Sequence, residues 1–143
     1  MATVFDLAAY ILSKTGSITT MKLQNLVYYS QVWSLVWDEK PIFRNRIEAW
    51  ANGPVVPALC REHHGMFKIS ALPRGDASKL TKEQRETVDA VLDFYGKKNS
   101  QWLSDLSHAE APWKDVRGDC SPGEARGAEI TLSAMAEYYA NPY

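Results

Sequence analysis

The longest uncharged stretch of the chain organises the predicted fold. No residue between Lys22 and Asp38 carries a charge, and apolar side chains recur there at helical spacing on two faces. A helix with two apolar faces needs neighbouring elements on both sides. We therefore predict a buried central helix over residues 20–37, with Thr20 as its N-cap. One face carries Leu23, Leu26, Val27, Ser30, Trp33 and Trp37, and the other carries Tyr28, Val32, Leu35 and Val36.

Amphipathic patterns on either side of this stretch predict further helices. Each pattern follows a capping residue or a proline suited to the first helical turn, and several end at a glycine. The pattern before Gly16 is linked to the central helix by only a few residues, so these two helices should be neighbours. The segment 69–78 has no periodicity and is predicted as a surface loop. Start signals stand at Thr3, Pro57, Thr81, Ser100, Ser121 and Thr131.

The spacing of apolar residues is no longer helical between Pro41 and Pro57. Ile42 and Phe43, followed by the residues 47–50, favour either a short two-stranded ribbon near 42–50 or an extended loop. The whole chain is therefore predicted to be mainly α-helical. We expect a single compact domain, residues 1–143, of about five to seven helices around the buried central helix.

Composition narrows the functional classes. The formal net charge of the 143 residues is −1, so no electrostatic excess drives binding to nucleic acid or to an anionic membrane. The two cysteines, Cys60 and Cys120, stand far apart in the sequence, and neither a secretory leader nor a long apolar span is evident. We expect a cytoplasmic protein with reduced thiols that does not associate with membranes.

No pattern in the chain predicts catalysis. His108 and Glu110 have the H-x-E spacing of a zinc deaminase, but the Pro-Cys-x-x-Cys motif that supplies the other ligands is missing. Cys60, His63 and His64 lie within about one helical turn, yet a metal site needs at least three protein ligands in favourable positions. A glycine-rich phosphate loop and a nucleophile elbow are also missing. We therefore predict that the protein is not an enzyme and uses neither a cofactor nor a metal.

The first two predicted helices also resemble a helix-turn-helix. A recognition helix presents Arg, Lys, Asn or Gln to base edges and needs basic neighbours for phosphates. The central helix offers Lys22, Gln24, Asn25 and Gln31 among large aromatic residues. The near-neutral charge makes DNA binding the less favoured alternative.

Four motifs in a fixed order carry a resemblance to a known family. They are Lys22–Gln31, Pro41–Phe43, Ile47–Trp50 together with Asn52–Pro57, and His108–Trp113. In this order they are similar to the Panacea antitoxin domain, the family of SocA-like antitoxins and phage-associated GepA-like proteins. The likeness extends over essentially the whole chain.

The resemblance implies an antitoxin of a toxin–antitoxin system. Its partner would be a cognate protein toxin encoded by the adjacent gene and neutralised by direct protein–protein binding. One branch of the family instead acts as a proteolytic adaptor that delivers a toxin to a ClpXP-type protease, and this alternative stays open. The oligomeric state is also open. The chain departs from the family pattern at Asn25, where a second lysine is usual, and at Ser30, where alanine is usual.

The candidate partner-binding surface comprises the turn near Trp50 and polar positions of the central helix. A Gly-Pro turn holds its backbone rigidly, so it can present side chains at a low ordering cost. The alternative is that the same motif residues only fix a loop onto the core. The candidate contacts are Lys22, Gln24, Asn25, Gln31, Glu48, Trp50 and Asn52. The motif residues expected to be structural are Leu23, Tyr28, Tyr29, Gly53, Pro54, Val55, Pro57, Pro112 and Trp113.

Overall fold

A computed structural model describes residues 2–117 and 128–140 of the chain. The fold of these residues is mainly helical, as predicted. Within these ranges it has seven α-helices, one π-helical turn, one 3-10 turn and two small antiparallel sheets. The predicted start signal at Ser121 lies outside the described residues. The elements are α1 (Val4–Thr15), β1 (Ile18–Thr19), α2 (Thr20–Trp33), η1 (Ser34–Asp38), β2 (Glu48–Trp50), β3 (Gly53–Val55), α3 (Pro57–His63), β4 (Lys68–Ile69), η2 (Ala77–Lys79), α4 (Lys82–Tyr95), α5 (Ser100–Ala109), α6 (Ala111–Arg117) and α7 (Leu132–Ala140).

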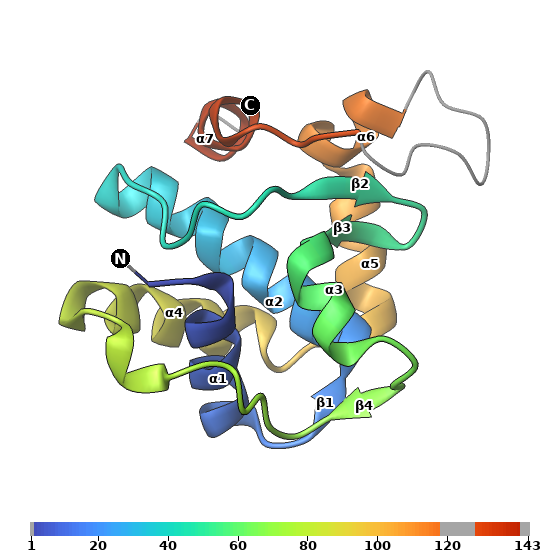
Figure 1. Cartoon of the computed structure of the whole chain (residues 1–143). Helices are drawn as coiled ribbons and strands as arrows, with labels where there is room; N and C mark the ends of the chain where they lie inside the picture. Colours follow the sequence, from blue (N-terminus) through green and yellow to red (C-terminus); the bar gives the residue numbers. More distant parts are fainter. Residues whose placement is uncertain (1, 118–127, 141–143) are drawn as a thin grey trace.

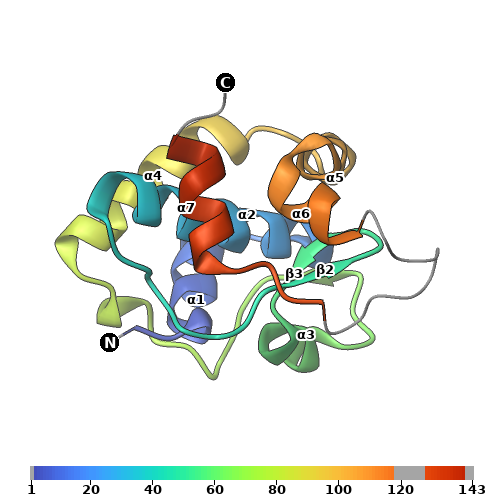
Figure 2. The same cartoon turned by 90° about the horizontal axis from the view of Figure 1, so that it is seen from above.

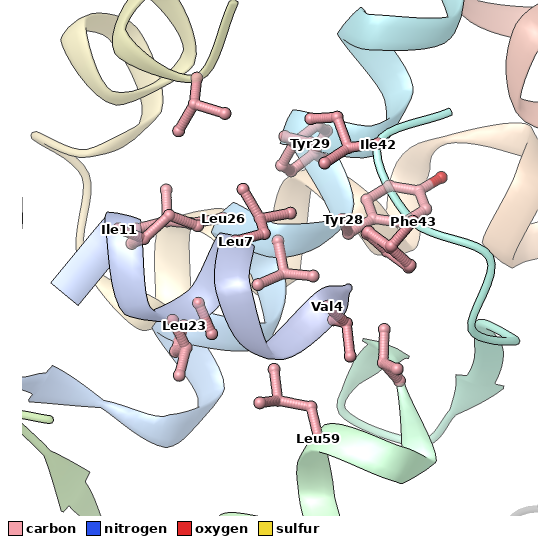
Figure 3. Packing of buried hydrophobic residues seen from close by; sticks show 14 of the residues in the cluster. Val4, Leu7, Ile11, Leu23, Leu26, Tyr28, Tyr29, Ile42, Phe43 and Leu59 are labelled. Carbon is pink, nitrogen blue, oxygen red and sulfur yellow. The ribbon is translucent and has the colours of Figure 1, made fainter. Parts of the chain in front are cut away.

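Helix α2 is the axis of the molecule. It packs against α1, α4, α5, α7 and β3, and these elements surround it in two perpendicular views (Figures 1 and 2). Its residues from Leu23 to Val32 are all buried. The predicted burial on both faces is therefore confirmed. Figure 3 shows Leu23, Leu26, Tyr28 and Tyr29 packed with residues of α1, α3 and the segment after η1.

The ends of α2 differ from the prediction. Thr19, rather than Thr20, is the N-cap, because its hydroxyl accepts a hydrogen bond from Lys22 N at 3.1 Å. The α-helical pattern stops at Trp33, and a π-helical turn follows. A π turn holds more residues than an α turn, so the side chains after Trp33 no longer lie on the predicted apolar face of the helix. Trp37 is consequently 53% exposed rather than buried.

Three of the predicted start signals are confirmed as N-caps. Thr3 and Thr81 form capping boxes with Asp6 and Gln84, and Thr131 accepts a hydrogen bond from Ala134 N. These side chains satisfy backbone N–H groups that have no partner inside the helix.

The segment 69–78 is only partly the predicted surface loop. Its first residue, Ile69, pairs with Ile18, and Leu72 is buried. A Cβ at Gly75 would lie 2.0 Å from the carbonyl oxygen of Phe5, so this glycine is required for close packing on α1.

Of the two alternatives predicted for residues 42–50, a ribbon that pairs 42–43 with 47–50 does not form, whereas the extended loop is present over residues 42–47. Ile42 and Phe43 are buried but form no strand, because the amide of Gln31 satisfies their backbone groups. The actual hairpin joins β2 to β3, with Trp50 paired to Gly53. None of the helices in the described ranges is long and apolar enough to span a membrane.

Candidate functional site

The β2–β3 hairpin forms the centre of the candidate site. Gly53 has φ 138°, a conformation that other residues adopt only with strain, and this places the turn at Ala51 and Asn52. Pro54 lies opposite Ala49 in the hairpin. The N–H of Ala49 points away from β3 and donates to Ala128 O at 2.9 Å. Ala49 and Pro54 therefore form a pair without hydrogen bonds between them, and the missing N–H of the proline costs the sheet no hydrogen bond.

Two contacts hold the indole and the backbone of Trp50. Its Nε1 donates to Glu48 Oε1 at 2.8 Å, while Arg46 Nε donates to Glu48 Oε2 at 2.9 Å. From α6, Trp113 Nε1 donates to Trp50 O at 2.8 Å, and the ring of Trp113 stacks on His108 at 4.0 Å. The hairpin therefore lies fixed against α6, and Glu48 and Trp113 contribute to its position (Figure 2).

Gln24 fixes the junction between the hairpin and α3. Its Oε1 accepts from Val56 N at 2.9 Å, and its Nε2 lies 3.4 Å from Val56 O and 3.0 Å from His63 Nε2. Since Nε2 is a donor, His63 Nε2 accepts, which requires a neutral ring. Burial lowers the pKa of His63 and favours that neutral form.

Gln31 has an equivalent role farther along α2. Its side chain is fully buried and bonds to Ile42 N at 2.8 Å and to Phe43 O at 2.8 Å. This position leaves it no surface to offer a partner. The side chain of Lys22 also bonds within the chain, because its Nζ donates to Gly96 O at 2.7 Å. Burial lowers the pKa of this amino group. It lies beside the end of α4, away from the hairpin.

Asn25 is buried beneath the hairpin. Its Nδ2 donates to Met21 O at 3.1 Å, whereas its Oδ1 has no hydrogen-bond partner among the described residues. A Cβ at Gly53 would lie 3.7 Å from that Oδ1. Asn25 therefore lies directly under the turn that Gly53 forms.

A hollow of about 290 Å³ lies between the N-terminus of α2, the hairpin and α3. Four of the seven candidate contacts line it, whereas Lys22, Gln31 and Glu48 do not. Asn52 is exposed and Trp50 is partly buried, so these two can reach a partner directly. The four candidates that the hollow brings together are Gln24, Asn25, Trp50 and Asn52.

The residues predicted to be structural fall into two groups. Leu23, Tyr28 and Tyr29 are buried in the core, and Pro57 is at the first turn of α3. The others form or support the hairpin: Gly53, Pro54 and Val55 make β3, while Pro112 and Trp113 belong to α6.

Sequence reasoning did not assign His63 and Met21 to the site, although both line the hollow. His63 was considered only as a metal ligand, since its nearness to Gln24 depends on tertiary packing. Among the described residues, no group of three or more His, Cys, Asp or Glu side chains is placed to hold a metal ion.

Glu110 is a second feature that the sequence did not reveal. Its Oε1 accepts hydrogen bonds from Tyr29 Oη at 2.6 Å and from Tyr139 Oη at 2.7 Å. Tyr28 Oη lies 3.0 Å from Tyr139 Oη, so the network joins α2, α7 and the end of α5. Burial raises the pKa of the Glu110 carboxyl group. This network positions α7, and it lies apart from the residues that line the hollow.

A cluster of exposed aromatic residues lies away from the hairpin, on α4, α5 and η1. Phe94 is 56% exposed and contacts Trp102 edge to face, with Lys98 Nζ 4.8 Å from the Trp102 ring. Trp37 stacks on Trp33 nearby. None of these residues belongs to the four sequence motifs.

Comparison with known families gives one match. The sequence model of the family described as "Antitoxin SocA-like, Panacea domain" matches residues 23–114, which is more than half of the chain. The matched region includes α2 from Leu23 onward, the hairpin and Trp113. Comparisons with curated proteins and with solved structures give no match.

Proposed function

The chain belongs to the Panacea domain family of SocA-like antitoxins, and on this premise we propose that it neutralises a cognate protein toxin by direct contact. The contact surface is the hollow beside the hairpin, together with Trp50 and Asn52. The toxin is the product of the adjacent gene. Neither catalysis nor a cofactor takes part in this function.

One observation supports this surface above the others. Four candidate residues from two motifs far apart in sequence, α2 and the hairpin, line the same hollow. The hairpin is held by Gln24, Glu48 and Trp113, so it loses little conformational entropy when a partner binds. Tryptophan is also the residue type most enriched among energetically dominant interface contacts.

DNA recognition through α2 receives no support from the geometry. Gln24, Asn25 and Gln31 are at most 4% exposed. Their amide groups bond to backbone atoms of the same chain, and Lys22 bonds to Gly96 O. These side chains are therefore not available to base edges.

A growth-rescue experiment tests the proposal. The product of the adjacent gene is expressed alone, with the wild-type chain, or with Asn52→Arg, which puts a larger charged side chain at the edge of the hollow. We expect the wild type to restore growth and Asn52→Arg to restore it poorly. Gln101→Arg, at an exposed position of α5, is the control and should rescue like the wild type.

Two outcomes would contradict the proposal. If the wild-type chain neither rescues growth nor co-purifies with the toxin, direct neutralisation is wrong for that pair. If rescue depends on a ClpXP-type protease and the toxin level falls, the chain acts as a proteolytic adaptor. A thermal unfolding curve of Asn52→Arg confirms that the variant is folded.

A further inference from the structure

A second hollow adjoins the first across Trp50. It has a volume of about 540 Å³ and is lined by Trp50, Pro57, Cys60, Arg61 and His64. Trp50 and Cys60 line both hollows. The two hollows therefore form one continuous surface over the hairpin and α3, with the indole of Trp50 between them.

An exposed apolar pair extends this surface on the side of α2. Met66 and Phe67 are 51% and 75% exposed. Their backbone is nevertheless held, because Thr20 N donates to Phe67 O at 2.9 Å and Met66 N donates to His63 O at 2.9 Å. Thr20 and His63 line the first hollow, so the apolar pair lies at its edge.

The charge of this surface is basic. Arg61 lines the second hollow, and Lys68 directly follows the exposed Phe67. Both are exposed, and neither forms an ion pair within the described part of the chain. Glu62 is the one carboxylate in the sequence from 57 to 69, and Arg74 binds it at 3.1 Å. Glu48 is likewise bound by Arg46. Two cations therefore stand on this face without a carboxylate paired to them.

The other exposed aromatic cluster has mixed charge. Helix α4, which carries Phe94, has four acidic residues and two basic ones, and Lys98 lies over the rings of Phe94 and Trp102. Because the net charge of the chain is only −1, the basic character near α3 is a local property. Surfaces of this kind attract partners of opposite charge and accelerate their association.

We infer that the toxin meets this surface with an acidic segment that carries a large apolar side chain. The apolar side chain enters the first hollow, whose volume of about 290 Å³ suits one side chain better than a drug-sized molecule. Met66 and Phe67 cover its flank, and the carboxylates of the segment meet Arg61 and Lys68. The inference rests on the proposed function and specifies the chemistry of the partner.

An acidic protein segment fits better than a nucleic acid. A duplex is bound through many phosphate contacts, whereas this face offers two cations without a paired carboxylate beside a partly open, partly apolar hollow. One anchor side chain with flanking carboxylates uses both features of the surface.

Charge reversal tests the inference. The probe is the purified product of the adjacent gene, and its dissociation constant is measured at low and at high salt. We expect Arg61→Glu and Lys68→Glu each to weaken binding by about tenfold at low salt and to reduce its salt dependence. Lys82→Glu makes the same charge change at an exposed position of α4 and should stay within about twofold of the wild type.

A second pair of variants tests the apolar part. Phe67→Ser should weaken binding by about tenfold or more, whereas Phe94→Ser, in the other aromatic cluster, should not. Both positions are more than half exposed, so the substitutions leave the core intact. Thermal unfolding curves verify this.

The possible failures are distinguishable. If the wild-type chain does not bind the probe, the proposed function fails. If the wild type binds but Arg61→Glu behaves like Lys82→Glu, or Phe94→Ser is the damaging variant, only this inference is overturned. Salt-dependent binding of a DNA duplex or an RNA that Arg61→Glu abolishes would also overturn it and assign the face to nucleic acid.

Discussion

Individual polar residues of α2 act mainly inside the protein. Gln24 and Gln31 use their amide groups to satisfy backbone atoms of segments that are neither helix nor sheet at those points. Buried backbone groups need such partners, because leaving one unpaired costs free energy. The sequence showed polar residues on an otherwise apolar helix but not whether they point to a partner or to the backbone of the same chain.

Replacement of Gln24 should destabilise the fold. Gln24→Met keeps the side-chain length but leaves the buried Val56 N–H unpaired. We expect the free energy of unfolding to fall by about 1–3 kcal/mol. Urea denaturation measures it, and Gln101→Met, at an exposed position, is the control with an expected change within about 0.5 kcal/mol. Equal effects of the two variants would contradict the structural role of Gln24.

Glu110 should make stability depend on pH. Burial raises its pKa above the ordinary value of 4.5, so the folded protein binds this proton more tightly than the unfolded chain does. Its contribution to stability is present in full below the ordinary pKa and is lost as the pH rises through the raised value. Glu110→Gln removes this titration.

Urea denaturation of the wild type and Glu110→Gln at several pH values checks that sign. Relative to the variant, the wild type should lose stability as the pH rises from about 4 to 7. A wild type that gains stability relative to the variant over this interval would show that the pKa is lowered instead.

At the scale of elements, local sequence signals predicted helix starts better than strand pairing. Thr3, Thr81 and Thr131 act within their own helices, so a few neighbouring residues determine them. The β2–β3 hairpin was not predicted, because Asn52 and Gly53 were interpreted as an interruption of the chain's regular structure, whereas they belong to the turn region of the hairpin. Residues 128–130, just before α7, form hydrogen bonds with residues 47–49 at β2. Because these two segments are far apart in the sequence, no local pattern predicts that they meet.

The attachment of α7 should depend on the hydroxyl of Tyr139. That hydroxyl contacts Tyr28 Oη and donates to Glu110 Oε1, so Tyr139→Phe removes both interactions and leaves the carboxylate with one donor fewer. We expect a loss of about 1–3 kcal/mol in the free energy of unfolding. Tyr138→Phe, at a position with no hydroxyl hydrogen bond in the described structure, is the matched control. The same stability for both variants would show that the network does not hold α7.

At the scale of the whole molecule, the uncharged stretch of α2 correctly predicted a helix buried on both faces. The four motifs correctly identified the family. The surface was harder to predict, because α3 supplies His63 and Arg61 from a segment with no motif of its own. Only the folded chain brings these residues beside Trp50.

In the proposed function, the chain binds its toxin through the surface around Trp50. The most direct measurement is isothermal titration calorimetry of the purified adjacent-gene product with the wild type, Trp50→Ala and Trp102→Ala, after thermal unfolding curves show which variants are folded. We expect Trp50→Ala to weaken binding by about 30-fold or more, roughly 2 kcal/mol, and Trp102→Ala to change it by less than about twofold. If Trp50→Ala is unfolded, Asn52→Arg replaces it, with the same direction expected. A folded hairpin variant that binds like the wild type, or a Trp102→Ala variant that loses binding, would contradict toxin binding through the surface around Trp50.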